Sequence, residues 1–377
     1  MNSIERREAR FQRRVTAREV KRHKKLSQYD NFERVADVDN LYEAFMKSMR
    51  GVGWKESIQR YYYNALRNIL SLRRKLLAGE NIHSGFVEFT LRERGKVRRI
   101  RSVHISERIV QKCLCEQVLV PILTNSLIYD NGASMKNKGV HFALKRFILH
   151  MTRYYRQHKS NEGYALLIYF SKFFDSIDHN ILLDMINEKI KDERVRALTK
   201  ELIIVFGDGV SLGLGSQVSQ VSAVFFPNKL DHFIKEKLRI KYYGRYMDDL
   251  YLMHESKDYL KKCLDKIIEV CNSLKINVNM KKTRIVKLSQ GVEFLKGRYF
   301  LLPSGKVLRK GTKESTKRMR KKLKKFKVLI DNGKMNYHDL RTSYQSWRGN
   351  YKRRFNAYYR IYYLDKLYYN LFISNHT

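Results

Sequence analysis

Two adjacent carboxylates offer the clearest chemistry in this sequence. Asp248 and Asp249 end the tetrapeptide Tyr-Met-Asp-Asp, which lies between two apolar segments at residues 240–245 and 250–253. Two neighbouring carboxylates repel each other unless divalent cations lie between them and a phosphate group. Two such ions support phosphoryl transfer, because one activates an attacking hydroxyl and the other holds the leaving pyrophosphate. Paired aspartates in a turn are common in proteins, so the assignment of a catalytic role to this pair requires further motifs elsewhere in the sequence.

The elements that would position this turn follow from the apolar pattern. Residues 240–245 and 250–253 are predicted as a strand pair around the acidic turn, and the apolar run 164–170 as a buried strand. Residues 257–274 are predicted as an amphipathic helix. Residues 41–78 also show helical spacing, which a Gly-Val-Gly sequence breaks into two predicted helices.

The charge balance indicates a polyanionic partner. The chain has 77 Lys and Arg against 37 Asp and Glu, which gives a formal net charge of +40. Repulsion on this scale destabilises a fold unless a polyanion neutralises it, and nucleic acid is preferred to an anionic membrane surface. No apolar run is long enough to span a bilayer, no signal peptide precedes the basic start, and the four cysteines form neither a CxxC pair nor a zinc pattern. We therefore expect a cytoplasmic protein without a membrane partner.

From residue 41 to residue 349 the sequence resembles reverse transcriptases. Tyr-Met-Asp-Asp is the signature of that family, and companion motifs occur in the family's order. Residues 171–179, Ser-Lys-Phe-Phe-Asp-Ser-Ile-Asp-His, resemble the palm motif that follows the first catalytic aspartate. Residues 281–283 resemble the lysine-bearing palm motif, and residues 294–298 resemble the primer grip, with Lys296 where the family often has glycine.

A Gly-rich segment narrows the resemblance. Residues 212–220, Leu-Gly-Leu-Gly-Ser-Gln-Val-Ser-Gln, open a predicted helix, and glycines let a backbone approach a ligand closely. This form resembles bacterial reverse transcriptases of diversity-generating retroelements and the related unclassified enzymes of antiphage defence. It departs from the Pro-Gln-Gly form of group II intron enzymes. The resemblance implies an α+β fold, a right-hand polymerase of fingers, palm and thumb, with an RRM-like antiparallel palm sheet and a helical thumb.

The implied organisation has four segments. Residues 1–40 are a basic N-terminal extension, either a helix that becomes ordered on RNA or a loose arm. Residues 41–160 are expected to form the fingers and the start of the palm, and residues 161–300 the palm. Residues 301–377 are expected to form the thumb and a helical tail.

The resemblance also implies roles for individual residues. Asp248 and Asp249 would hold two Mg²⁺ ions, with Mn²⁺ as an alternative, together with the backbone carbonyl of Phe170 and the residue at position 169. The other implied residues bind the nucleotide. Lys96 and Arg98, on a hairpin of residues 86–103 with Gly95 in its turn, would contact the triphosphate. Phe174 would exclude a 2′-hydroxyl, Gln217 would line the pocket, and Lys282 would protonate the pyrophosphate.

The C-terminal region is extremely basic and is predicted to be helical. Residues 306–328 carry twelve Lys and Arg and one Glu, and residues 346–350 resemble the thumb of the same enzymes. A helix that follows a duplex backbone is preferred to a merely solvated surface. Tyr358, Tyr362, Tyr363 and Leu367 are interpreted as a helical core stripe, in preference to a base-stacking surface. The predicted contacts to nucleic acid are Lys317, Arg318, Lys321, Lys324, Lys325 and Arg348.

One position departs from the family pattern. The family has an aspartate two positions before Ser171, where this chain has Tyr169, and the motif of residues 171–178 fixes the register without a gap. A phenol with a pKa near ~10 is a poor magnesium ligand. Asp175 and Asp178 lie beyond the strand and fit better as caps of the next helix. A substitution made to trap a complex is slightly preferred to a natural change compensated by a partner subunit, or to an altered reaction.

The implied reaction is RNA-templated extension of a DNA 3′ end with dNTPs, in a protein encoded by a bacterium or a phage. One hypothesis is mutagenic cDNA synthesis in a diversity-generating retroelement, with a small accessory protein and a structured RNA. Another is an antiphage-defence enzyme that assembles with a noncoding RNA or a second reverse transcriptase subunit. A third is a catalytically silent nucleic-acid-binding scaffold, which Tyr169 favours and the intact aspartate pair disfavours. A homo-oligomer is compatible with all three.

Overall fold

The computed structural model describes residues 3–93, 96–311, 313–352, 354 and 357–374. The chain divides into two compact units, each assembled from three stretches of sequence. Unit 1 contains Met1–Gly139, Phe170–Arg239 and Asp265–Asn279, and unit 2 contains Val140–Tyr169, Ile240–Leu264 and Met280–Thr377. In the described part of the chain, no helix is both long enough and apolar enough to cross a membrane.

The N-terminal part of unit 1 is helical. The basic start of the chain forms one long helix, α1 (Ser3–Ser27), instead of a loose arm. After the short helix α2 (Glu33–Ala36), the stretch predicted as two helices forms three, because Asn64, with φ −115° and ψ 32°, interrupts the second. The three helices are α3 (Val38–Ser48), α4 (Glu56–Tyr63) and α5 (Ala65–Leu77).

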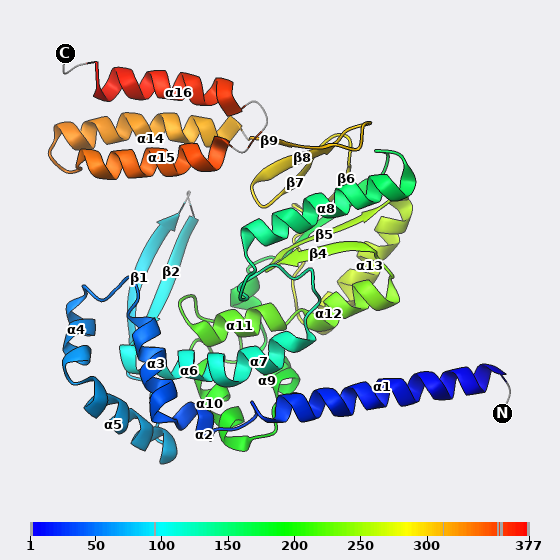
Figure 1. Ribbon diagram of the computed structural model, residues 1–377, viewed down its shortest axis with the longest axis vertical. Helices are drawn as coiled ribbons and strands as arrows, with labels where there is room; N and C mark the ends of the chain where they lie inside the picture. Colours follow the sequence, from blue (N-terminus) through cyan, green and yellow to red (C-terminus); the bar gives the residue numbers. More distant parts are fainter. Residues whose placement is uncertain (1–2, 94–95, 312, 353, 355–356, 375–377) are drawn as a thin grey trace. The chain divides into compact units, whose positions relative to one another are not determined.

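A hairpin and a second group of helices complete unit 1 (Figure 1). Strands β1 (Phe86–Glu93) and β2 (Lys96–Val103) pair antiparallel over their whole length, and the turn predicted at Gly95 lies outside the described residues. A buried helix, α6 (Ile105–Leu114), packs against α3 and against α11 (Gln217–Phe225). The helices that follow the hairpin are α6 (Ile105–Leu114), a π-helical turn (Cys115–Leu119), α7 (Val120–Leu123), α9 (His179–Asn187), α10 (Glu193–Ile204), α11 (Gln217–Phe225) and α12 (Asn228–His232).

Unit 2 is built on a four-stranded antiparallel sheet. The strands lie in the order β4-β5-β3-β6, with bounds β4 (Tyr242–Tyr246), β5 (Asp249–His254), β3 (Tyr164–Tyr169) and β6 (Arg284–Lys287). The three apolar segments predicted as strands therefore form three neighbouring strands of this sheet, with β5 and β3 at its centre and β4 at one edge. The helix predicted after them is α13 (Lys257–Ser273), whose residues from Asp265 onward belong to unit 1. A second sheet contains β7 (Val292–Phe294), β8 (Gly297–Leu301) and β9 (Val307–Lys310).

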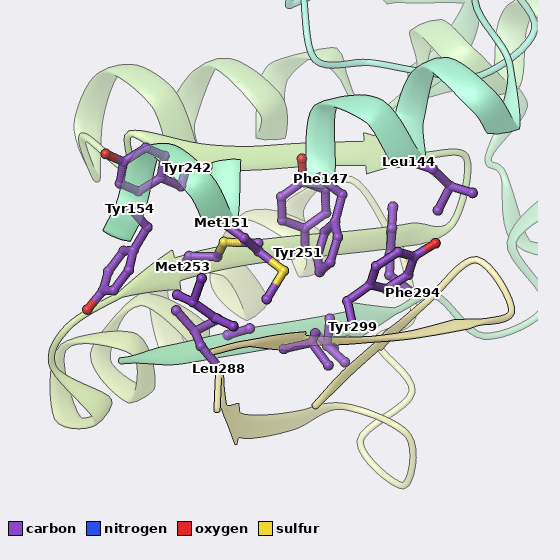
Figure 2. Close-up of a cluster of buried hydrophobic side chains, with 14 of the residues drawn as sticks. Leu144, Phe147, Met151, Tyr154, Tyr242, Tyr251, Met253, Leu288, Phe294 and Tyr299 are labelled. Atoms are coloured by element: carbon purple, nitrogen blue, oxygen red, sulfur yellow. The ribbon is translucent and has the colours of Figure 1, made fainter. Parts of the chain in front are cut away.

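An aromatic core joins the two sheets of unit 2 to helix α8 (Val140–His158), as Figure 2 shows. The Phe147 ring of α8 stacks on Phe294 at a centroid distance of 5.0 Å and meets the edge of Tyr251 at 4.8 Å. Tyr251 lies on β5, five positions along the chain from Tyr246, and its ring is almost completely buried. The core therefore fixes the strands that carry the acidic turn from one side.

Three helices form a C-terminal bundle: α14 (Lys313–Asp331), α15 (Tyr337–Lys352) and α16 (Ala357–Phe372). The core stripe predicted for the tail is wrong in its tyrosines, because Tyr358, Tyr362 and Tyr363 are exposed. Leu367 is partly buried, as predicted. The buried side chains of α16 are Ala357, Ile361, Leu364 and Phe372. The combination of helices with antiparallel sheets confirms the predicted α+β class.

Candidate active site

The aspartate pair lies at the tip of the β4–β5 hairpin. Tyr246 and Asp249 form the last pair of the ladder, which leaves Met247 and Asp248 as a two-residue turn. Met247 has a φ of 54°, as turns that match the twist of a two-residue hairpin require. The hairpin therefore holds both carboxylates at one end of the sheet, as the sequence predicted.

Asp249 is the centre of a row of three side chains that crosses the sheet. It pairs with Tyr246 on β4 and with Tyr169 on β3, and residues directly opposite each other in antiparallel strands project from the same face. Both tyrosines pack against the aromatic core of unit 2. The position where the resemblance implies an aspartate thus holds a phenol directly opposite Asp249.

The electrostatics of this row favour neutral phenols. Burial raises the pKa of Tyr169, and the negative charge of Asp249 raises it further. The same two causes raise the pKa of Tyr246. Both side chains therefore remain O–H groups at physiological pH, and a neutral phenol does not replace the carboxylate that would bind a cation.

A buried arginine supports the turn from the neighbouring position. Arg245 is 1% exposed, and its Nη1 donates a hydrogen bond to the Met247 carbonyl oxygen at 3.2 Å. A charged hydrogen bond of this kind stabilises a backbone carbonyl strongly when water is excluded. Sequence analysis did not single out Arg245, although a lone arginine inside an apolar strand was the available signal.

The donor set fits one divalent cation better than two. Asp248 and Asp249 supply carboxylate oxygens, and Mg²⁺ is commonly held by one or two carboxylates together with substrate phosphates. Within the described ranges, no three His, Cys, Asp or Glu side chains gather into a metal-binding group. Phe170, expected to lend its carbonyl, belongs to unit 1, where it forms an isolated antiparallel bridge with Val278.

Lys282 lies in unit 2, on the segment that leads into the sheet. It is exposed in the turn just before β6, the strand that pairs with β3 from Tyr164 to Leu167. Arg284, two residues further along the chain, forms an ion pair with Glu293 at 2.7 Å, so the charge of that arginine is compensated. The predicted role of Lys282 toward pyrophosphate stays a prediction.

Unit 1 brings the palm motif and the Gly-rich segment together. The Phe174 carbonyl accepts a hydrogen bond from the Leu212 N–H at 2.7 Å, and the Ile177 carbonyl accepts one from Ser211 at 3.0 Å. Phe174 itself is half-buried and meets the ring of Phe173 edge-on. The predicted steric gate therefore lies beside the start of the Gly-rich segment.

The glycines of this segment are required by their surroundings. A Cβ on Gly213 would lie 1.8 Å from the Phe206 ring, so a larger residue does not fit. Gly215 has a φ of 118°, which L-residues rarely adopt, and a Cβ there would approach the Arg101 carbonyl oxygen to 3.1 Å. The backbone thus packs closely against both Phe206 and strand β2.

Gln217 begins α11 at a well-defined position. Ser216 caps the helix, since its Oγ accepts from the Ser219 N–H at 3.2 Å. The Gln217 N–H donates to Gln111 Oε1 at 3.2 Å, and Gln111 Nε2 donates to Glu107 at 2.9 Å. Glu107 is fully buried, and burial raises its pKa against the opposing effect of its hydrogen bond with His83.

The β1–β2 hairpin contacts the neighbourhood of the Gly-rich segment through Arg101, near the C-terminal end of β2. Arg101 donates to Glu88 at 3.0 Å and to the Phe206 carbonyl at 2.9 Å. Arg98 is exposed near the far end of β2, opposite Leu91. The Lys96 side chain lies outside the described part of the structure. The predicted triphosphate contacts of Lys96 and Arg98 stay predictions.

Asp178 has the structural role that the sequence predicted. Its side chain accepts from the Ile181 N–H at the start of α9 at 3.1 Å. It also forms an ion pair with Lys275 at 2.7 Å, and this hydrogen bond is the main reason that the pKa of Asp178 is lowered. Asp178 is therefore accounted for without a metal.

The basic residues of the C-terminal bundle fall into two groups. Helix α14 buries Met319, Leu323 and Phe326, and the five cations predicted on it are exposed away from these positions. Arg348 on α15 instead forms a bidentate ion pair with Asp365 on α16, with distances of 3.1 to 3.2 Å. Its charge is thus compensated inside the bundle. The exposed group consists of Lys317, Arg318, Lys321, Lys324 and Lys325.

The sequence matches a known protein family. The family described as reverse transcriptase (RNA-dependent DNA polymerase) matches residues 91–298, a range that includes the acidic turn, the palm motif and the Gly-rich segment. No curated protein matches the sequence.

Solved structures to which the chain is similar include telomerases from two Candida species. Apo telomerase from Candida tropicalis, truncated from the C-terminal domain, has a TM-score of 0.48 and 14% identity over 64% of this chain and 60% of that chain. Telomerase from Candida albicans, with a fragment of telomeric RNA, has a TM-score of 0.48 and 11% identity over 72% of this chain and 55% of that chain. The chain thus spans less than two thirds of these structures, and the family assignment depends on the sequence match.

Proposed function

Because the chain belongs to the reverse transcriptase family, we propose that it binds an RNA template, a DNA 3′ end and a dNTP for RNA-templated DNA synthesis. The observation that carries the proposal is the Asp248–Asp249 turn at the tip of the β4–β5 hairpin. A rigid turn with two carboxylates is suited to phosphoryl transfer, where catalysis depends on position and charge. Mg²⁺, when bound there by Asp248 and Asp249, would neutralise the phosphates and stabilise the pyrophosphate.

The residues of unit 1 would bind the nucleotide and the strand that it joins. Phe174 would contact the sugar and exclude a 2′-hydroxyl, and Gln217 would supply uncharged hydrogen bonds at the start of α11. Lys96 and Arg98 would contact the triphosphate, and Lys282 in unit 2 would give a proton to the leaving pyrophosphate. The cations of α14 would follow the duplex backbone.

Tyr169 makes this chain a weak polymerase by itself. The position opposite Asp249 holds a neutral O–H group, and a carboxylate there would add the charge that a second cation requires. The second candidate function is therefore a catalytically silent subunit that binds nucleic acid while a partner performs the chemistry. The raised pKa of Tyr169 is the observation that favours it.

Primer extension on an RNA template with Mg²⁺ and dNTPs tests both functions. We expect Tyr169→Asp to extend the primer on the order of a hundredfold faster than the unchanged chain. Tyr169→Phe is the matched control, because it removes the hydroxyl without adding charge, and it should stay slow. Addition of Asp249→Asn to Tyr169→Asp should abolish the gain. Equal extension by the unchanged chain and by Tyr169→Asp would refute the idea that the reaction requires a carboxylate at position 169 beside Asp248 and Asp249. If both forms bind RNA and neither extends the primer, the silent subunit is favoured.

The biological setting is proposed as a bacterial or phage-encoded retroelement or defence system, with a noncoding RNA and an accessory protein or second subunit. The Gly-Ser-Gln form of residues 215–217 supports this choice by resemblance. Expression with the flanking genes in bacteria would separate the two settings. Protection against phage infection would support defence, and altered cDNA copies in a repeated target gene would support the retroelement.

A further inference from the structure

The last helix exposes an unusual number of aromatic rings. Five tyrosines of α16 have large exposed fractions: Tyr358 84%, Tyr359 65%, Tyr362 55%, Tyr363 48% and Tyr369 52%. We call these five residues the tyrosine face. Large exposed apolar patches on a folded protein commonly mark an interaction site.

The tyrosine face exists because the opposite side of α16 is packed. Ile361, Leu364 and Phe372 are buried, and α16 packs against both α14 and α15. The bundle core also contains the stacked rings of Tyr344 and Tyr368, at a centroid distance of 4.8 Å. The exposed tyrosines are therefore not needed for the core of the bundle.

The rings of the tyrosine face do not stack flat on each other. Tyr359 and Tyr363 share a hydrogen bond between their hydroxyls at 2.9 Å, and their rings meet at an interplanar angle of 72°. Tyr362 and Tyr363 meet at 78°. Edge-on contacts of this kind hold the side chains in place and leave ring faces open to a planar partner.

The segment that carries the tyrosine face is strongly basic. Residues 313–372 contain seventeen Lys and Arg against four Asp and Glu. The one acidic residue of α16, Asp365, is compensated by Arg348. Lys366 is exposed on the same helix. A protein partner with ordinary surface charge would gain little from these surroundings, whereas a polyanion would gain much.

We infer that the tyrosine face binds single-stranded nucleic acid, with unpaired bases stacked on the rings and the phosphates held by neighbouring Lys and Arg. Exposed aromatic rings beside cations are the usual means of binding single strands without sequence preference. This binding needs neither metal nor nucleotide, so it goes beyond the proposed polymerisation and does not depend on Tyr169.

The test measures the affinity of the full chain for a short unstructured RNA by fluorescence anisotropy. The variant Tyr359→Ser/Tyr363→Ser should bind at least fivefold more weakly for each base that loses its ring, and Tyr359→Phe/Tyr363→Phe should bind like the unchanged chain. The control is Tyr63→Ser on α4, because Tyr63 is 88% exposed in unit 1, and its affinity should not change. Circular dichroism checks that the bundle remains folded.

An abasic oligonucleotide of equal length separates stacking from charge. The unchanged chain and the Ser double variant should bind it equally, since no base is present to stack. Equal affinity of the two proteins for the normal RNA would overturn the inference. A change in sedimentation of the Ser variant, with unchanged RNA affinity, would also overturn it and would assign the face to a second copy of the chain.

Discussion

Tyr169 and Asp249 occupy directly opposite positions at the end of the β3–β5 ladder, and burial together with the carboxylate of Asp249 raises the pKa of the Tyr169 phenol. The Asp249 carboxylate therefore tolerates the Tyr169 side chain only while the phenol is protonated, because a phenolate would repel it. An aspartate at position 169 would face Asp249 with a like charge, and it would need a cation between the two.

Tyr169→Asp should consequently make stability depend on Mg²⁺. Without divalent cations, the like charges should lower the free energy of unfolding by a few tenths to about 1 kcal/mol. Added Mg²⁺ should raise the Tm of this variant more than that of the unchanged chain, because binding to the folded state stabilises it. Tyr169→Asn is the uncharged control in thermal unfolding. Equal Mg²⁺ shifts for the Asp and Asn variants would show that position 169 does not take part in cation binding.

Arg245→Leu should destabilise unit 2. The substitution removes the charged hydrogen bond to the Met247 carbonyl and leaves that oxygen without this donor, at a cost of about 2 kcal/mol. Urea unfolding measures the change, and Arg67→Leu on the exposed side of α5 is the control, expected within about 0.5 kcal/mol of the unchanged chain. If both substitutions cost the same, the buried arginine does not support the turn.

Gly213→Ala should destabilise unit 1 by about 1 to 3 kcal/mol, because the new Cβ would overlap the Phe206 ring. Phe206→Leu in the same chain should recover part of the loss, since it removes the overlapping ring atoms. Gly139→Ala is the matched control, because a Cβ at that glycine meets nothing within 4 Å. Additive effects of the Gly213 and Phe206 substitutions would contradict the predicted contact.

The Asp178–Lys275 ion pair should give a pH-dependent contribution of about 1 kcal/mol, reduced by the exposure of the lysine. Lys275 lowers the pKa of Asp178 below its usual 3.8, so the contribution is complete above that pH and is lost as pH falls through the lower folded value. Lys275→Met should therefore be less stable than the unchanged chain at pH 6 and equally stable at the acid end. Lys266→Met, an exposed change on α13, the helix that precedes Lys275, should show no such convergence.

The exposed cations of α14 should determine the salt dependence of RNA binding. Lys317→Gln and Lys321→Gln should each reduce the slope of log affinity against log salt by about 1 if each lysine contacts a phosphate. Arg348→Gln should leave the slope unchanged and lower bundle stability, because its partner is Asp365. If Arg348→Gln reduced the salt slope and the two lysine substitutions did not, Arg348 and not the α14 lysines would be the residue that contacts phosphate.

The central strands of the sheet and the acidic turn could be predicted because their signal is local. Residues 164–169 form an apolar run that reads as a buried strand, and two more apolar segments flank the turn. The pairing of Tyr169 with Asp249 could not be read in the same way, since the register depends on contacts between residues eighty positions apart.

The buried side of α16 was mispredicted for a physical reason. The set Ala357, Ile361 and Leu364 and the set containing Tyr358 and Tyr362 repeat at the same helical spacing and differ by one position. Both sets are largely apolar, so the choice depends on which side α14 and α15 cover. The ion pair of Arg348 with Asp365 could not be predicted either, because the sequence shows the charge of the arginine but not which carboxylate lies near it in the folded chain.

The phenol opposite Asp249 also has a consequence at the level of the gene. Codons for tyrosine and aspartate differ only in their first base, so one base substitution would place a carboxylate beside Asp249 without moving any strand. Continued selection for DNA synthesis by this chain alone would find that substitution readily. A tyrosine that persists at position 169 in a replicating population would therefore mean that the phenol itself is under selection.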